Sequence, residues 1–137
     1  MMLKALNLNS GYGRSQVLFD VSIDIAEGEV IGLLGRNGMG KTTLVRTLTG
    51  QLISGGSITL MGQNVTGWSP DRLARAGLAI VPEGRQCFPN LTVREHLTAF
   101  ADHRNDSIAM QWDCDRVFDM FPRLRERKDQ LAGTMSG

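Results

Sequence analysis

Residues 35–43 read "GRNGMGKTT" and give the strongest indication of the fold. This stretch follows the apolar run "VIGLL" and precedes "LVRTLTG", so a buried strand is expected to lead through a glycine-rich loop into a helix. Glycine allows backbone conformations that are closed to other residues, so successive N–H groups can turn toward one anion. The helix that begins near Lys41 adds the positive end of its dipole at the same point. The stretch therefore predicts a loop that binds phosphate groups.

The residue types in this loop also fit the chemistry of a nucleotide. The spacing satisfies G-x-x-x-x-G-K-[ST], the phosphate-binding motif known as Walker A. Lys41 supplies a mobile positive charge for the outer phosphates, and the Thr42 hydroxyl suits one position in the octahedral shell of Mg²⁺. The expected cofactor is therefore Mg²⁺. The loop residues expected to bind nucleotide are Gly35, Arg36, Asn37, Gly38, Met39, Gly40, Lys41, Thr42 and Thr43.

Composition excludes several other classes of protein. The chain has 137 residues, 42% of them hydrophobic, and a formal net charge of +1, so it can bury a core and has no general attraction for nucleic acid. Its apolar runs are far shorter than the ~20 residues of a membrane-spanning helix. Two cysteines and two histidines lack the spacing of a metal cluster. The sequence also contains neither D-x-x-G nor N-K-x-D, which weighs against a GTPase.

Hydrophobic patterns predict strands on both sides of the loop. Residues 3–9 and 21–26 alternate between apolar and polar, as half-buried strands do, and residues 57–60 predict another strand. Residues 30–34 and 78–81 are apolar on both faces, which is typical of buried strands in a parallel sheet.

Capping and breaking residues predict the helices. The helix after the loop should bury Leu44, Val45 and Leu48 and end at Gly50. Further helices are expected from Pro70, capped by Ser69 and ended near Gly77, and from the Thr92–Glu95 capping box. "HRNDS", residues 103–107, should interrupt this helical part. A helix over residues 112–121 should then present an apolar stripe and end at Pro122; the stripe comprises Trp112, Val117, Met120 and Phe121.

Several of these motifs together resemble the ATP-binding cassette (ABC) ATPases. Tyr12, just ahead of "RSQVLFDVSIDIAEGEVIGLLGRNGMGKTTL", resembles the aromatic loop of that family, in which the ring stacks on adenine. "LTVREHL" and "FPRL" are similar to the start of its helical subdomain, and "TMSG" to the opening of its signature sequence L-S-G-G-Q. The resemblance implies an α/β P-loop NTPase of ABC type. Residues 1–84 would form the strand-rich nucleotide-binding core, and residues 85–137 the Q-loop exit and the start of a helical subdomain.

Glu83 narrows the resemblance to one subgroup. It stands where most ABC ATPases carry the glutamine of the Q-loop, and a carboxylate can only accept hydrogen bonds there. "VPEGR" followed by "FPNLTV" resembles the ATP-binding subunits of branched-chain amino acid importers. Urea and amide importers look similar and stay open as an alternative. The resemblance implies that Lys41 and Glu83 are catalytic and that Thr42 and Glu83 face Mg²⁺.

The resemblance also implies partners and a location. Two such subunits, identical or different, would close around two ATP molecules, with Ser136 and Gly137 beginning the signature surface offered to the other subunit. Permease subunits would place the protein on the cytoplasmic face of the membrane. The sequence stops inside the signature motif, so we expect an incomplete, truncated domain that holds Mg-ATP without turning it over. The remaining alternative is a non-enzymatic nucleotide-binding module.

Overall fold

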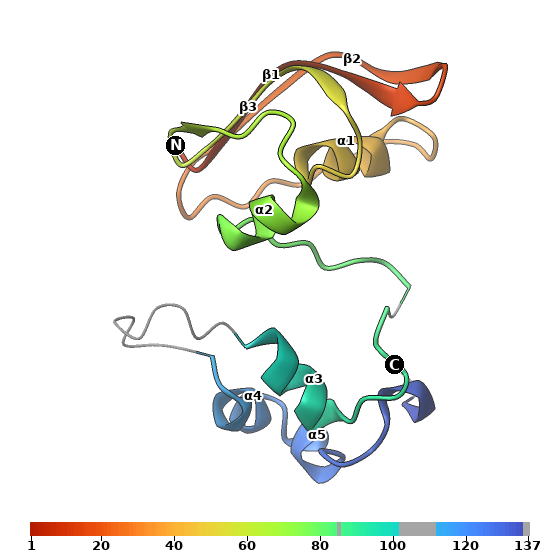
Figure 1. The fold of residues 1–137 in the computed structure, drawn as a ribbon, viewed down its shortest axis with the longest axis vertical. Helices are drawn as coiled ribbons and strands as arrows, with labels where there is room; N and C mark the ends of the chain where they lie inside the picture. The colour runs from red at the N-terminus through yellow and green to blue at the C-terminus, as the bar shows by residue number, and fades with distance from the viewer. Residues whose placement is uncertain (85, 102–111, 136–137) are drawn as a thin grey trace. The chain divides into compact units, whose positions relative to one another are not determined.

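The computed structural model describes residues 1–84, 86–101 and 112–135 (Figure 1). These residues belong to two compact units, Met1–Val81 and Pro82–Gly137.

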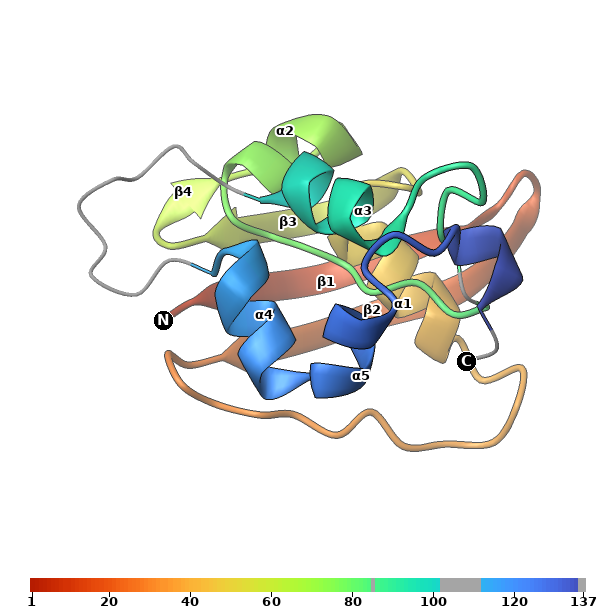
Figure 2. The ribbon, with the colours of Figure 1, turned by 90° about the horizontal axis from the view of Figure 1, so that it is seen from below.

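The first unit is built on an antiparallel sheet in the order β2-β1-β3-β4. A hairpin with its turn at residues 13–14 joins β1 (Leu3–Tyr12) to β2 (Ser15–Ile25). β3 (Ser54–Leu60) pairs with the other edge of β1, and the short β4 (Gln63–Asn64) lies beside β3 in Figure 2. The strands predicted at residues 3–9, 21–26 and 57–60 are confirmed, and all three are longer than expected. The second begins earlier than predicted, at Ser15, and ends one residue earlier, at Ile25.

A bulge in β1 changes which residues face the core. The pairing with β2 shifts between Ala5 and Leu8, and Asn7 adopts a positive φ of 52° within this irregularity. Because a bulge adds one residue to the strand, the buried positions pass from Leu3 and Ala5 to Leu8 and Ser10. Leu8 thereby joins the buried face of Leu3 and Ala5, while Leu6, next to Ala5, lies on the opposite face and is 40% exposed.

Two helices follow the predicted boundaries. α1 (Lys41–Leu48) begins after Gly40 and ends before Gly50, which has a positive φ of 72°. α2 (Pro70–Arg75) has Ser69 at its N-cap and Pro70 in its first turn. The prediction that α1 buries Val45 was wrong, because Val45 is 38% exposed; Leu44 and Leu48 are buried as predicted.

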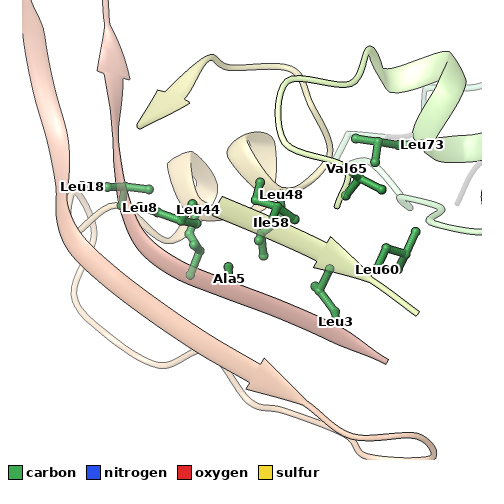
Figure 3. Close-up of a cluster of buried hydrophobic side chains, with 10 residues drawn as sticks. All are labelled: Leu3, Ala5, Leu8, Leu18, Leu44, Leu48, Ile58, Leu60, Val65 and Leu73. Carbon is green, nitrogen blue, oxygen red and sulfur yellow. The ribbon is translucent and has the colours of Figure 1, made fainter. Parts of the chain in front are cut away.

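The core of this unit lies between the sheet and the helices. Figure 3 shows leucines of β1 and α1 pointing into the same layer, with Ile58 of β3 beside them. The buried cluster comprises Leu3, Ala5, Leu8, Leu18, Leu44, Leu48, Ile58, Leu60, Val65 and Leu73. Since β1 and β2 pair with each other and contact α1, this core fixes the helix against the hairpin.

The prediction of two buried parallel strands was wrong for the structure described. Residues 30–34 and 78–81 have no strand conformation, and Val30 and Val81 are each 95% exposed. A strand forms only where a neighbour completes its hydrogen bonds, and no strand among the described residues pairs with either run. Apolar residues favour burial, but a strand also needs a partner strand for its backbone hydrogen bonds.

The second unit is helical. It contains α3 (Val93–Phe100), α4 (Cys114–Met120), α5 (Pro122–Glu126) and a short 3₁₀ helix η1 (Ala132–Thr134). Figure 2 shows α4 leading directly into α5. An isolated bridge joins Thr92 to Leu131, so the start of α3 is tied to the chain after α5. None of the described helices is long and apolar enough to cross a bilayer.

The capping box of α3 is confirmed, and the apolar stripe expected over residues 112–121 was wrong. Trp112, Met120 and Phe121 are each more than half exposed, at 58%, 58% and 52%. Val117 is half-buried, and the buried side chain is Phe118. The helix begins only at Cys114, after an Asp113 cap, so Trp112 lies outside it. Seven helical residues place one side chain, Phe118, fully inside. Residues 103–107, the expected break, lie outside the described residues.

Candidate phosphate-binding site

Positive φ angles shape the loop that precedes α1. Gly35, Gly38 and Gly40 have φ values of 154°, 83° and 88°, which side-chain-bearing residues rarely adopt. A turn closes the loop, because the Met39 N–H donates to the Arg36 carbonyl at 3.3 Å. The Gly40 carbonyl then accepts from Leu44 N–H at 2.8 Å and starts the helix. The glycines thus have the conformational role that the sequence predicted.

The Lys41 side chain is hydrogen-bonded to two carbonyl groups of this loop. Its ammonium donates to the Gly35 carbonyl at 2.6 Å and to the Arg36 carbonyl at 2.8 Å. An ammonium group carries three N–H donors, so two bonds to the loop leave one for a further acceptor. The positive charge is therefore held beside the same backbone that forms the turn, at the N-terminal end of α1.

The two threonines after Lys41 have different environments. Thr42 is exposed, whereas Thr43 is only 5% exposed and faces the core side of α1. The Thr42 hydroxyl is accessible to an incoming ligand or cation. Among the other loop residues, Arg36, Asn37 and Met39 are exposed.

Tyr12 ends β1 beside the same helix. The Arg46 Nη1 atom of α1 donates to Tyr12 Oη at 3.5 Å, and Tyr12 is 43% exposed. A hydrogen bond with the Thr43 side chain lowers the pKa of the Tyr12 phenol, and the Arg46 guanidinium lowers it further. Sequence reasoning had missed Arg46. The one available signal was its spacing of three residues from Thr43, which puts both on one face of a helix.

The remaining predicted residues belong to the second unit or lie outside the described residues, so their position relative to this cluster is not defined. Glu83 is exposed in a bend of the second unit, so no distance from it to the loop is defined. Ser136 and Gly137 lie outside the described residues. Over residues 1–84, 86–101 and 112–135, no group of three or more His, Cys, Asp or Glu side chains could hold a metal. The exposed Thr42 hydroxyl, with phosphate oxygens and water, would suit a Mg²⁺ ion at this loop, since this hard cation keeps much of its hydration shell.

Comparison with known proteins decides the family. The ABC transporter family matches residues 18–137, which include the loop, α1 and the helical unit. The chain belongs to the ABC transporter family.

Two relatives from branched-chain amino acid transport cover nearly the whole chain. The first is the high-affinity branched-chain amino acid transport ATP-binding protein BraG of Pseudomonas aeruginosa, 42% identical over 99% of this chain and 58% of that protein. The second is the probable branched-chain amino acid transport ATP-binding protein LivF of Archaeoglobus fulgidus, 35% identical over 99% of this chain and 58% of that protein. The chain thus spans less than two thirds of the length of these ABC proteins.

Solved ABC structures share the fold. A nucleotide-free ATP-binding cassette from an ABC transporter superposes with a TM-score of 0.72 at 26% identity, covering 98% of this chain and 59% of that one. An ATP-binding subunit of an ABC transporter gives a TM-score of 0.76 at 25% identity, covering 99% of this chain and 56% of that one. These likenesses confirm the predicted class, an α/β P-loop NTPase of ABC type.

Proposed function

We propose that this chain is the nucleotide-binding part of an ATP-hydrolysing subunit that drives an importer of branched-chain amino acids. The observation that carries the proposal is the loop of residues 35–40, braced by Lys41 and directly continued by α1. The two relatives named for branched-chain amino acid transport support the choice of solute.

The proposed ligand is ATP with Mg²⁺. The N–H groups of the loop and the Lys41 ammonium would bind the β- and γ-phosphates, and the exposed Thr42 hydroxyl would hold the cation. The adenine would stack on the Tyr12 ring, which is partly exposed at the end of β1. When bound, Mg²⁺ would neutralise phosphate charge.

Three further residues keep roles that rest on the sequence resemblance. Glu83 would approach the cation and the attacking water, while Ser136 and Gly137 would contact the nucleotide of a second ATPase subunit. Permease subunits would bind the helical unit and hold the protein at the cytoplasmic face of the membrane. Urea or amide import is the corresponding alternative for the solute.

Nucleotide binding is tested with the purified chain by isothermal titration calorimetry with Mg-ATP. Lys41→Ala should weaken binding about 10–100-fold, because it removes a charge-assisted hydrogen bond to phosphate. Lys4→Ala is the matched control, since Lys4 lies on β1 and pairs only loosely with Asp24, at 3.9 Å. Circular dichroism would verify that both variants are folded. Equal affinities of Lys41→Ala and the unaltered chain would refute the proposed site.

Turnover and solute need separate measurements. Phosphate release by the purified chain tests whether it hydrolyses ATP by itself, and the expectation of no turnover stays a prediction. Deleting the encoding gene in its host should lower uptake of radiolabelled leucine, isoleucine and valine and leave urea uptake unchanged. Loss of urea uptake alone would instead favour the urea importer.

A further inference from the structure

Tyr12, which is proposed to stack on the adenine base, is hydrogen-bonded to α1 through its hydroxyl group. Arg46 Nη1 donates to Tyr12 Oη at 3.5 Å, and the Thr43 side chain also lowers the pKa of this phenol. Both partners come from α1 and are three residues apart, so they share one face of the helix. The contact is therefore with a single rigid element.

The position of these bonds on the ring has a functional consequence. Hydrogen bonds to Oη engage the edge of the ring and leave its two faces available for stacking. Tyr12 is 43% exposed, and in the part of the chain that the structure describes it makes no aromatic or cation–π contact. A partly exposed tyrosine without an anchor would sample several rotamers and lose this freedom on binding a base.

The hydrogen bond from Arg46 to Tyr12, called the anchor below, also links the ring that would stack on the base to the loop that would bind the phosphates. α1 begins at Lys41, whose ammonium braces the phosphate loop, and Arg46 lies on the same helix. The ring and the loop are therefore positioned by one element.

We propose that Arg46 is a positioning residue that holds the Tyr12 ring in the orientation in which it accepts the adenine of a nucleotide bound by the loop. This inference rests on the proposed function. It assigns to Arg46 no contact with phosphate, and it predicts that Arg46 affects recognition of the base alone.

Titration of the phenol tests the anchor without any nucleotide. Tyr12 is the one tyrosine of the chain, so the rise in absorbance at 295 nm at high pH reports this group alone. Arg46→Met should raise the phenol pKa toward its ordinary value, since it removes a hydrogen bond and a neighbouring positive charge. Arg46→Lys should restore part of the shift because it keeps the charge.

Arg75→Met is the matched control, because it changes the net charge equally and Arg75 is an α2 residue paired with Asp71 at 3.0 Å. Its titration should coincide with that of the unaltered chain. A titration of Arg46→Met that coincides with the unaltered chain would overturn the proposal.

Ligand competition tests the effect on the base. Arg46→Met should weaken binding of Mg-ATP about 2–10-fold through lost orientation of the stacking ring. It should leave the affinity for inorganic tripolyphosphate unchanged, because that ligand has no base. Equal losses for both ligands would place Arg46 with the phosphate loop and overturn the proposal. Failure of the unaltered chain to bind either ligand would refute the proposed function and the role of the ring in base binding, while the titration would still decide whether the anchor exists.

Discussion

A Cβ atom on Gly40 would lie only 3.0 Å from Cδ2 of Leu18. It would also lie 3.3 Å from Cγ1 of Val17, so β2 forms a wall directly behind the residue that starts α1. The phosphate loop is thus supported from behind by the hairpin, and its last glycine is required for space as well as for conformation.

Gly40→Ala should therefore be more destabilising than an alanine elsewhere in the loop. A positive φ costs an alanine about 1–2 kcal/mol, and overpacking against Leu18 adds about 1–3 kcal/mol. Gly38→Ala is the control, because Gly38 has a similar φ of 83° but nothing within 4 Å of the added Cβ. Urea unfolding followed by circular dichroism would measure both, and equal losses of stability would contradict the role of the wall.

Leu8→Ala should lower the free energy of unfolding by about 2–5 kcal/mol, because it leaves a cavity in the core. Leu8 is fully buried, at 0% exposure, whereas Leu6 on the same strand is 40% exposed. Leu6→Ala is expected to cost well under half as much. Thermal unfolding compares the two variants, and losses of similar size would contradict the bulge at Asn7, because without it Leu6 and Leu8 would lie on the same face of β1.

Thr47→Val should destabilise α1 against β1 by about 1–3 kcal/mol, since it removes a buried hydroxyl from its partners at nearly constant volume. Thr47 Oγ1 lies 2.9 Å from Ser10 Oγ and 2.8 Å from the Thr43 carbonyl oxygen. The control is Thr49→Val. In the unaltered chain the Thr49 hydroxyl bonds a carbonyl of the same helical segment, at 2.9 Å from the Val45 carbonyl oxygen. Similar unfolding midpoints for the two variants would refute a special role for the Thr47–Ser10 contact.

Acid should weaken the start of α3 through Glu95. The Thr92 N–H and the Thr92 hydroxyl both donate to Glu95 Oε2, each at 2.8 Å. The backbone bond, followed by the side-chain bond, lowers the pKa of Glu95. Because the folded-state pKa lies below the unfolded one, the stabilisation is fully present above the unfolded pKa and is lost as pH falls through the folded value.

Glu95→Gln tests this pH dependence. Glutamine also accepts the capping bonds but does not titrate, so its variant should lose less stability on acidification than the unaltered chain. Amide hydrogen exchange at the first turn of α3 between neutral and acidic pH would follow the effect. Identical acid dependence in the two proteins would contradict it.

Local chemistry explains which parts of the structure could be predicted. The capping box at Thr92, the proline start of α2 and the glycine stop at Gly50 all concern groups a few residues apart, so the sequence specifies them directly. The loop conformation at Gly35, Gly38 and Gly40 belongs to the same class.

The phosphate loop, the capping box of α3 and membership of the ABC transporter family follow from the sequence alone, because each depends on residues at fixed spacing along the chain. The other features depend on tertiary contacts. Residues 30–34 have no neighbouring strand to pair with, and the bulge at Asn7 turns Leu8 onto the buried face of β1. The hydrogen bond between Arg46 and Tyr12 joins residues 34 positions apart. Pairing and packing bring together groups whose separation along the chain carries no local signal, so only the folded arrangement could place them.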